Sequence, residues 1–153
     1  MEVKIKKLSE NAIIPVKATS GSAAYDVFLP RNYRIRPGRQ VLPLDLSIEL
    51  PHGYQAMIEP RSGFSAKGFE GESNPGYPCR YDADVIQGKI DSDHRGNIGV
   101  IVKSKDCFTA LKGTRVAQLT IQKVEDAYFV ECDQLSETER GSGGFGHTGT
   151  NKI

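Results

Sequence analysis

The chain has 153 residues, the length of one compact domain with a single core. Hydrophobic residues make up 38% and charged residues 25%, a composition that excludes a membrane-spanning or a disordered chain. Twenty Lys and Arg against 19 Asp and Glu leave a formal net charge of +1, which does not favour stable binding to a polyanion such as nucleic acid.

Apolar and polar residues alternate with the period of a β-strand in several segments. The pattern predicts strands at residues 3–6, 44–50, 54–58 and 116–124, and the apolar β-branched run at 98–102 predicts a buried strand. Gly and Pro mark turns between them, as at 36–38, 51–53, 74–76 and 112–113. No window favours a helix of three turns. We therefore expect an all-β fold, a sandwich, jelly roll or barrel of short antiparallel strands.

Cys79, Cys107 and Cys132 are odd in number and widely spaced, so neither a disulfide framework nor a CxxC metal site fits. We expect each to be a small buried hydrophobic residue. The first residues lack the apolar stretch of a signal peptide. These features predict a protein of the cytoplasm or nucleus that is not secreted and has no membrane segment.

Polar residues stand where two early strands begin or end. Asp26 follows a polar turn and could reach a metal through water or merely cap the turn. Pro60 ends a strand, and Arg61 and Ser62 then offer donors for phosphate, with Gly63 allowing close backbone approach. A structural ion pair is an equal alternative for Arg61.

The densest group of titratable residues lies at 88–97. Asp91 directly follows Ile90, and a carboxylate at a strand end could deprotonate a water, whereas Asp93 and Arg95 suit a surface turn and ion pair. Further along, Arg115 and Gln118 stand three residues apart in a predicted strand. That spacing places them on opposite faces, where they would serve different partners.

The glycine-rich end of the chain, residues 140–150, has no apolar set that could build a core. A frayed tail is one interpretation. The other is a lid, because Phe145 could stack on a flat ligand while Arg140 and backbone N–H groups meet phosphates.

Taken together, residues 20–26, 60–63, 88–96, 115–119 and 140–149 stand in the order and approximate spacing of five motifs of the homotrimeric dUTP diphosphatases, or dUTPases. The chain resembles this family over nearly its whole length. The resemblance implies a jelly-roll-like antiparallel β barrel or sandwich over residues 1–138, and a flexible Gly-rich C-terminal arm, residues 139–153, that closes the active site. It also implies a homotrimer in which each site is shared between subunits.

The resemblance further implies Mg²⁺-dependent hydrolysis of dUTP to dUMP and pyrophosphate, which limits uracil incorporation into DNA and supplies dUMP for thymidylate synthesis. Asp91 matches the catalytic aspartate that activates the attacking water, and Asp26 matches the aspartate that reaches Mg²⁺ through water. The positions that match substrate-binding residues are Arg61, Ser62, Gly63, Gln87, Gly88, Lys89, Ile90, His94, Gly99, Gln118, Arg140, Phe145, Gly146, His147 and Thr148.

Three positions depart from the family pattern. His94 stands where tyrosine is common; we predict that it lies against deoxyribose but discriminates less well against UTP, and a solvent-facing turn residue is the alternative. Residues 70–82 lengthen the link between the second and third motifs. They could rim the active site, cover the trimer surface or be inert. His147 replaces a common serine.

Two other functions are alternatives for a chain with these motifs. The dCTP deaminases are related enzymes with the same fold, but Arg61, Ser62, Gly63 and the Phe145 arm resemble the diphosphatases. A non-catalytic binding module is the second alternative, with residues 70–82 as its contact. Release of pyrophosphate, release of ammonia or mere binding separates the three.

Overall fold

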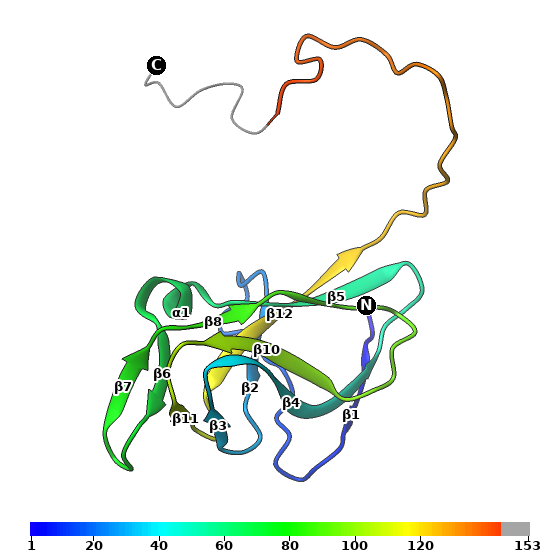
Figure 1. Ribbon diagram of the computed structural model, residues 1–153. Coiled ribbons are helices and arrows are strands. Elements are labelled where there is room, and N and C mark those ends of the chain that lie inside the picture. Colours follow the sequence, from blue (N-terminus) through cyan, green and yellow to red (C-terminus); the bar gives the residue numbers. More distant parts are fainter. Residues whose placement is uncertain (145–153) are drawn as a thin grey trace.

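A computed structural model describes residues 1–144 of the chain and confirms the predicted all-β fold (Figure 1). The described part holds twelve strands and one short helix. In chain order these are β1 (Lys4–Lys7), β2 (Tyr25–Phe28), β3 (Tyr33–Ile35), β4 (Gly38–Glu49), β5 (Tyr54–Glu59), α1 (Ser62–Lys67), β6 (Phe69–Glu72), β7 (Pro78–Tyr81), β8 (Ala83–Ile86), β9 (Gly88–Ile90), β10 (Ile98–Ser104), β11 (Phe108–Ala110) and β12 (Arg115–Lys123).

The strands form three four-stranded sheets in which every pair is antiparallel. Their orders are β1-β4-β10-β8, β3-β11-β6-β7 and β2-β12-β5-β9. The five strands expected from alternation or a continuous apolar run correspond to β1, β4, β5, β10 and β12. The remaining strands have only three or four residues each, too few for a period of two to stand out.

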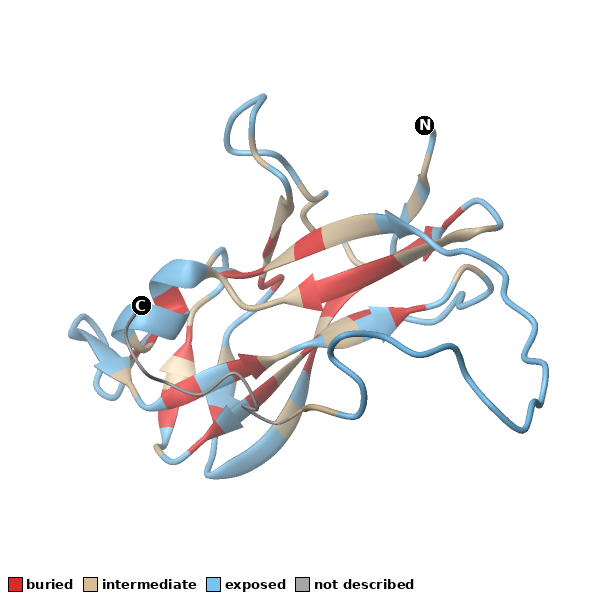
Figure 2. Ribbon diagram, turned by 90° about the horizontal axis from the view of Figure 1, so that it is seen from above, coloured by how far each residue is buried: buried red, intermediate tan, exposed pale blue. Residues whose placement is uncertain are grey.

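The core lies between the sheets, where the inward residues of successive strands are buried (Figure 2). An aromatic cluster fills one part of it. The ring of Phe69 lies 4.7 Å from that of Phe64 and 5.4 Å from that of Phe108, and Tyr81 stacks on Phe108 at 4.2 Å. This cluster joins α1 to the sheet that contains β6, β7 and β11.

The middle of β4 differs from the simple alternation expected of it. Strict alternation over residues 44–50 would leave Asp45 and Ser47 on the polar face of the strand, but both are buried, Asp45 being 4% exposed. The register with β10 shifts here, because Ile98 pairs with Leu46 while Gly99 pairs with Pro43. This bulge turns Asp45 inward with a φ of 56°.

Inside the fold, the Asp45 carboxylate finds charged and polar partners. It forms an ion pair with Arg31 and accepts a 3.4 Å hydrogen bond from Asn97 Nδ2. Burial by itself would raise the pKa of Asp45, but hydrogen bonds from neighbouring side chains, Arg31 and Asn97 among them, outweigh it and hold the pKa below its usual value. Asn97 ends the loop that begins at Asp91, so this network also ties that loop to β4.

The prediction of three buried cysteines is wrong, because Cys79, Cys107 and Cys132 are all exposed. Cys79 lies in β7 at the edge of its sheet, Cys107 lies in the turn before β11, and Cys132 lies beyond the last strand.

Beyond β12 the chain leaves the body of the fold (Figure 1). Residues 124–144 contain no further strand, and the side chains of Tyr128 and Phe129 are almost fully exposed. Among the described helices, none has the length and apolar character needed to cross a membrane.

Candidate active site

Several of the predicted phosphate-binding residues line one pocket of about 340 Å³. Apart from Ala18, the lining residues come from three of the five motifs, which lie far apart in the sequence. The lining residues are Ala18, Ser22, Ala23, Ala24, Asp26, Arg61, Ser62, Gly63, Arg115 and Gln118.

Three adjacent strands bring these motifs together. Gln118 of β12 is paired with Asp26 of β2 on one side and with Glu59 of β5 on the other. Pro60 follows β5 directly and cannot donate to a ladder, so the chain leaves the sheet there and enters α1. Arg61 is therefore the N-cap residue of α1 and lies within contact distance of Asp26 in β2 and Arg115 in β12.

The pocket has two guanidinium groups around one carboxylate. Arg61 Nε lies 3.2 Å from Asp26 Oδ1, and Arg115 Nη1 lies 3.4 Å from Asp26 Oδ2. Arg61 Nη1 also donates a 2.9 Å hydrogen bond to the carbonyl oxygen of Arg115. Asp26 neutralises only one of the two arginines, which leaves net positive charge for an anion. The ion pair foreseen for Arg61 is thus present, and it stands at the wall of the pocket where phosphate was predicted.

The prediction that Arg115 and Gln118 lie on opposite faces with separate partners is wrong, because both line this pocket. The cause is a bulge in β12. Arg115 pairs with Phe28 and Ala117 with Val27, so Val116 is an extra residue in the ladder. The extra residue restores Arg115 to the face that Gln118 occupies. Arg115 was absent from the predicted site residues, and its sequence gave no sign of the bulge.

Asp91 lies in a different pocket, of about 170 Å³. It follows β9 as predicted, but β9 runs antiparallel to β5, with Ile90 opposite Ala56 and Gly88 opposite Ile58. Asp91 is therefore beside the start of β5, whereas Arg61 follows its end. At about 3.3 Å per residue, the two side chains are anchored roughly 20 Å apart along one chain.

The pocket around Asp91 also contains residues that the sequence did not single out as a site. They are His52, Gly53, Tyr54, Gln55, Ser92, Val124 and Asp126. Nothing in their spacing identifies them, since the turn before β5, the end of β9 and the start of the C-terminal segment meet only in the folded chain.

The predicted uracil-reading positions Gln87, Gly88, Lys89 and Ile90 lie along β9 or directly before it. Gln87 Nε2 donates a 3.1 Å hydrogen bond to Glu59 Oε1, which fixes its side chain against β5. β9 thus runs from Gly88, opposite Ile58 of β5, to Ile90, which directly precedes Asp91.

Gly99 and His94 lie on β10 and on the loop before it. A Cβ atom on Gly99 would lie 2.7 Å from Val41 Cγ1, so close strand packing already requires glycine at this position. His94 is exposed in the turn after Asp91, where its backbone N–H donates to the Asp91 carbonyl at 3.1 Å, and its ring lies over Gly96.

Arg140 lies in a tight turn, where its Nε donates a 2.8 Å hydrogen bond to the carbonyl of Gly143. Phe145, Gly146, His147 and Thr148 lie outside the described residues.

Within residues 1–144, no three His, Cys, Asp or Glu side chains come together as a metal cage. Asp26 is the single carboxylate in the phosphate pocket, and its two oxygens already face arginines. A single carboxylate of this kind suits contact to a metal ion through water, with oxygens of a bound substrate holding the ion. It does not suit direct chelation of a metal by protein side chains alone.

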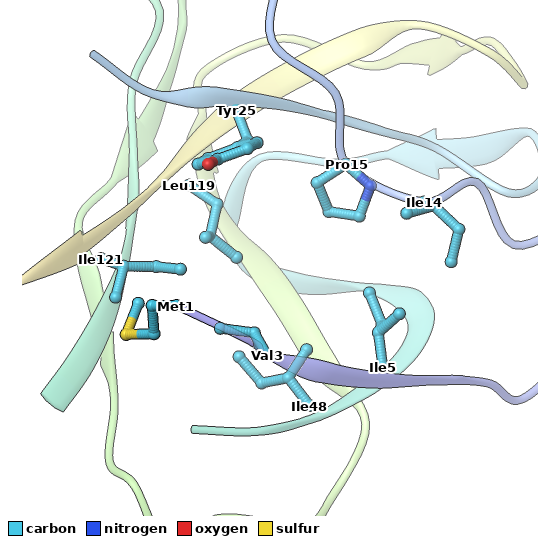
Figure 3. A pocket seen from close by; sticks show the side chains of 9 residues that line it. All are labelled: Met1, Val3, Ile5, Ile14, Pro15, Tyr25, Ile48, Leu119 and Ile121. Carbon is cyan, nitrogen blue, oxygen red and sulfur yellow. The ribbon is translucent and has the colours of Figure 1, made fainter. Parts of the chain in front are cut away.

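A third, apolar pocket of about 320 Å³ lies near the N-terminus (Figure 3). Side chains of β1, β2, β4 and β12 line it, together with Met1 and the segment before β2, and none of the predicted site residues is among them. Its lining offers almost no polar group to orient a nucleotide, so we do not assign the substrate to it.

The family model for dUTPase matches residues 10–149, nearly the whole chain. This chain belongs to the dUTPase family. The deoxyuridine 5′-triphosphate nucleotidohydrolase of Solanum lycopersicum is 40% identical over 149 residues, covering 95% of this chain and 80% of that protein. The protein of the same name from Nautilia profundicola is 39% identical over 153 residues, covering 97% of this chain and 99% of that protein.

Solved dUTPase structures share the fold. A Staphylococcus bacteriophage 80alpha dUTPase variant with dUpNHpp aligns with a TM-score of 0.82 at 24% identity, covering 97% of this chain and 99% of that one. This likeness supports the jelly-roll assignment of the three sheets, and homotrimers are known for the dUTPase family.

Proposed function

We propose that this chain hydrolyses dUTP to dUMP and pyrophosphate at sites shared between subunits of a homotrimer. The proposal rests on where the site residues lie in this member of the dUTPase family. Arg61, Ser62 and Arg115 surround an anion-sized pocket at one end of β5, and Asp91 lies at the other end. Because one chain holds Arg61 and Asp91 far apart, a complete site forms when one subunit supplies the arginine pocket and a second subunit supplies Asp91.

The arginine pocket binds the triphosphate. Arg61 and Arg115 present charged N–H donors, and the Ser62 hydroxyl and the backbone at Gly63 add neutral ones. Gln118 adds an amide from the same wall. Charge that develops on the phosphates during cleavage is met by donors already in place, which is the largest contribution a protein makes to phosphoryl transfer.

Asp91 supplies the base. Its carboxylate is exposed at the end of β9 and can accept a proton from a water molecule. The water oxygen then bonds to the α-phosphorus, the bond from that phosphorus to the bridging oxygen breaks, and pyrophosphate leaves with the electron pair. No covalent enzyme intermediate is needed.

Backbone groups of residues 87–90 and 99 read the uracil, and His94 lies against the sugar. Fixed donors and acceptors that match the uracil O4 and N3–H leave a buried group unpaired when cytosine binds, and this mismatch discriminates between the bases. The His94 ring is exposed on the loop that carries Asp91, a position that supports its contact with the deoxyribose.

Mg²⁺ is the proposed cofactor, with Asp26 as its contact through water. When bound to the triphosphate oxygens, the ion would neutralise phosphate charge. Asp26 keeps its place through Arg61 and Arg115, so the same ion pairs orient the carboxylate and the donors of the pocket. A structural Mg(II) ion is described for a dUTPase of a Staphylococcus aureus phage, which aligns at a TM-score of 0.72 and 21% identity.

Residues 1–138 would form the domain, residues 70–82 its inserted hairpin, and residues 139–153 the arm that closes the site with Arg140, Phe145, Gly146, His147 and Thr148. A nucleotide substrate and three free cysteines suit the cytoplasm or nucleus. Neither membrane nor stable nucleic-acid binding is part of the function.

The direct test is release of pyrophosphate from dUTP, dCTP, dTTP and UTP with Mg²⁺, with ammonia release followed in parallel. We expect dUTP-selective turnover, with UTP the best of the others because of His94. Asp91→Asn should lower kcat by about 10²–10⁴-fold. Asp93→Asn, two residues away on the same loop, is the matched control and should behave as wild type. A folded trimer that releases no pyrophosphate from dUTP, or whose Asp91→Asn variant stays active, contradicts the proposal.

Complementation tests whether the site is shared. Asp91→Asn and Arg61→Ala are each expected to be inactive, and chains of the two variants are mixed by co-refolding. A site that takes Asp91 from one chain and Arg61 from another is intact in about a quarter of cases when chains assort at random. Recovery of about that fraction of wild-type activity supports the shared site. Activity that stays at the level of the separate variants would show that one chain supplies both residues.

A further inference from the structure

The helix that carries the predicted phosphate-binding residues cannot hold its own position. α1 has six residues, and its N-cap residue Arg61 makes no side-chain capping hydrogen bond. Helices this short are unstable without tertiary contacts. The placement of Arg61, Ser62 and Gly63 therefore depends on what packs against α1.

The β6–β7 hairpin, residues 69–81, closes on the C-terminal end of this helix. Arg80 Nη1 donates a 3.1 Å hydrogen bond to the carbonyl of Gly68, the C-cap residue of α1. Arg80 Nη2 lies 2.9 Å from Glu70 Oε2 on the paired strand, so both sides of the hairpin hold the guanidinium. The backbone approach is equally close, since a Cβ on Gly68 would lie 2.7 Å from the Tyr81 carbonyl oxygen.

One aromatic ring connects Arg80 to Arg61. The guanidinium carbons of Arg61 and Arg80 each lie 5.8 Å from the centroid of the Phe64 ring, within range of a cation–π contact. Phe64 is 6% exposed and packs on Phe69, the first residue of β6. A change in the hairpin that shifts this ring shifts the surface on which the Arg61 side chain rests.

We infer that Arg80, held by Glu70, is a positioning residue for the triphosphate pocket: it anchors α1 and the Phe64 ring so that Arg61 meets the phosphates. Residues 70–82 thereby support the substrate site and are not an inert insertion. The inference rests on the proposed function in assigning the triphosphate to Arg61. It is separable from that function, because it concerns binding of the phosphate chain whatever nucleoside is attached.

Three variants of the full chain separate positioning from simple electrostatic attraction. Arg80→Ala removes the anchor. Glu70→Gln makes the region more positive while weakening the hold on Arg80, so attraction predicts tighter phosphate binding and positioning predicts weaker binding. Arg34→Ala is the matched control, because Arg34 is an exposed arginine of β3 in the same sheet whose side chain has no hydrogen bond or ion pair to the described residues.

The measurements are kcat and KM for dUTP, the Kd of tripolyphosphate and of dUMP by calorimetry, and the melting temperature. Arg80→Ala should raise KM and the tripolyphosphate Kd by about threefold to tenfold with kcat changed less, because uniform binding is lost. Glu70→Gln should raise both by a smaller factor. The dUMP Kd and the Arg34→Ala variant should match wild type.

Three other results would each overturn the inference. Unchanged tripolyphosphate binding in folded Arg80→Ala would show that α1 needs no support from the hairpin. Tighter binding in Glu70→Gln would assign the effect to charge, and equal weakening of dUMP and tripolyphosphate would assign it to general loss of structure. A fourth result concerns the proposed function alone. If wild type does not hydrolyse dUTP but binds tripolyphosphate more tightly than Arg80→Ala does, the proposed function is refuted and the inference stands.

Discussion

Replacing Asp45 by Asn should lower the free energy of unfolding by about 1–2 kcal/mol at neutral pH, because the buried carboxylate loses its charge-assisted partners. Hydrogen bonds to charged groups contribute about 1.5–3 kcal/mol, and we expect a loss around the lower end of that range because the Arg31 side chain is 49% exposed and its ion pair is screened by water. Asn retains an acceptor for Arg31 and tolerates the φ of 56°, so the change isolates the charge from backbone strain.

The stability lost in Asp45→Asn should be large at neutral pH and smaller at acid pH. The pKa of Asp45 is lower in the folded chain than its ordinary value, so the folded state favours the ionised form. Its contribution is complete above the unfolded pKa of about 3.9 and disappears as pH falls through the lower folded value. The stability difference between wild type and Asp45→Asn should therefore shrink as the pH falls below the unfolded pKa of about 3.9.

Denaturant unfolding at several pH values, at one fixed protein concentration, measures this difference. The concentration is held constant because assembly of subunits contributes to apparent stability. Asp84→Asn, at an exposed aspartate of β8, is the control and should leave the curves unchanged. A difference that persists undiminished at acid pH, or no difference at neutral pH, would refute the role assigned to the Asp45 charge.

Three further substitutions test the packing around the hairpin by thermal or denaturant unfolding. Gly71→Ala should destabilise the chain by about 1–3 kcal/mol, because its Cβ would lie 2.4 Å from Phe108 Cδ2, whereas Gly21→Ala meets no atom within 4 Å and should be neutral. Phe69→Ala should cost about 3–5 kcal/mol, since the ring is fully buried between two others, and a loss below 1 kcal/mol would contradict its place in the core. Tyr81→Phe should leave stability unchanged or raise it by up to about 1 kcal/mol, because its buried hydroxyl has no hydrogen-bond partner among the described residues; a clear loss would reveal one.

The sequence predicted the features of the fold that depend on short-range patterns, namely the long strands and the turns between them. The long strands β4, β5, β10 and β12 stand out because their apolar residues repeat over enough positions to set a period, and Pro60 marks the end of β5 because it cannot join the ladder. The order of the motifs likewise predicted the family. Each strand and each motif consists of residues near one another in the chain, so it can be recognised in the sequence without knowledge of the fold.

The rest depends on register, which sequence alone does not express. The bulge at Val116 reverses the expected faces of β12 and brings Arg115 into the pocket. The bulge in β4 buries Asp45, although strict alternation with its apolar neighbours would leave its side chain on the polar face. The separation of Asp91 from Arg61 follows from the antiparallel pairing of β9 with β5, which only the assembled sheet defines.

The central position of β12 also has a consequence for how the protein folds. The last strand of the chain pairs with β2, one of the first, and Arg115 meets Asp26 across 89 positions of sequence. Contacts of such long range must wait for the closing of a large loop, so this sheet should form late and slowly compared with its hairpins. During synthesis β2 and β5 would remain without their shared neighbour until nearly the whole chain has emerged. The phosphate pocket and the sheet that supports it would then be completed in the same step, and a chain interrupted before β12 would have neither.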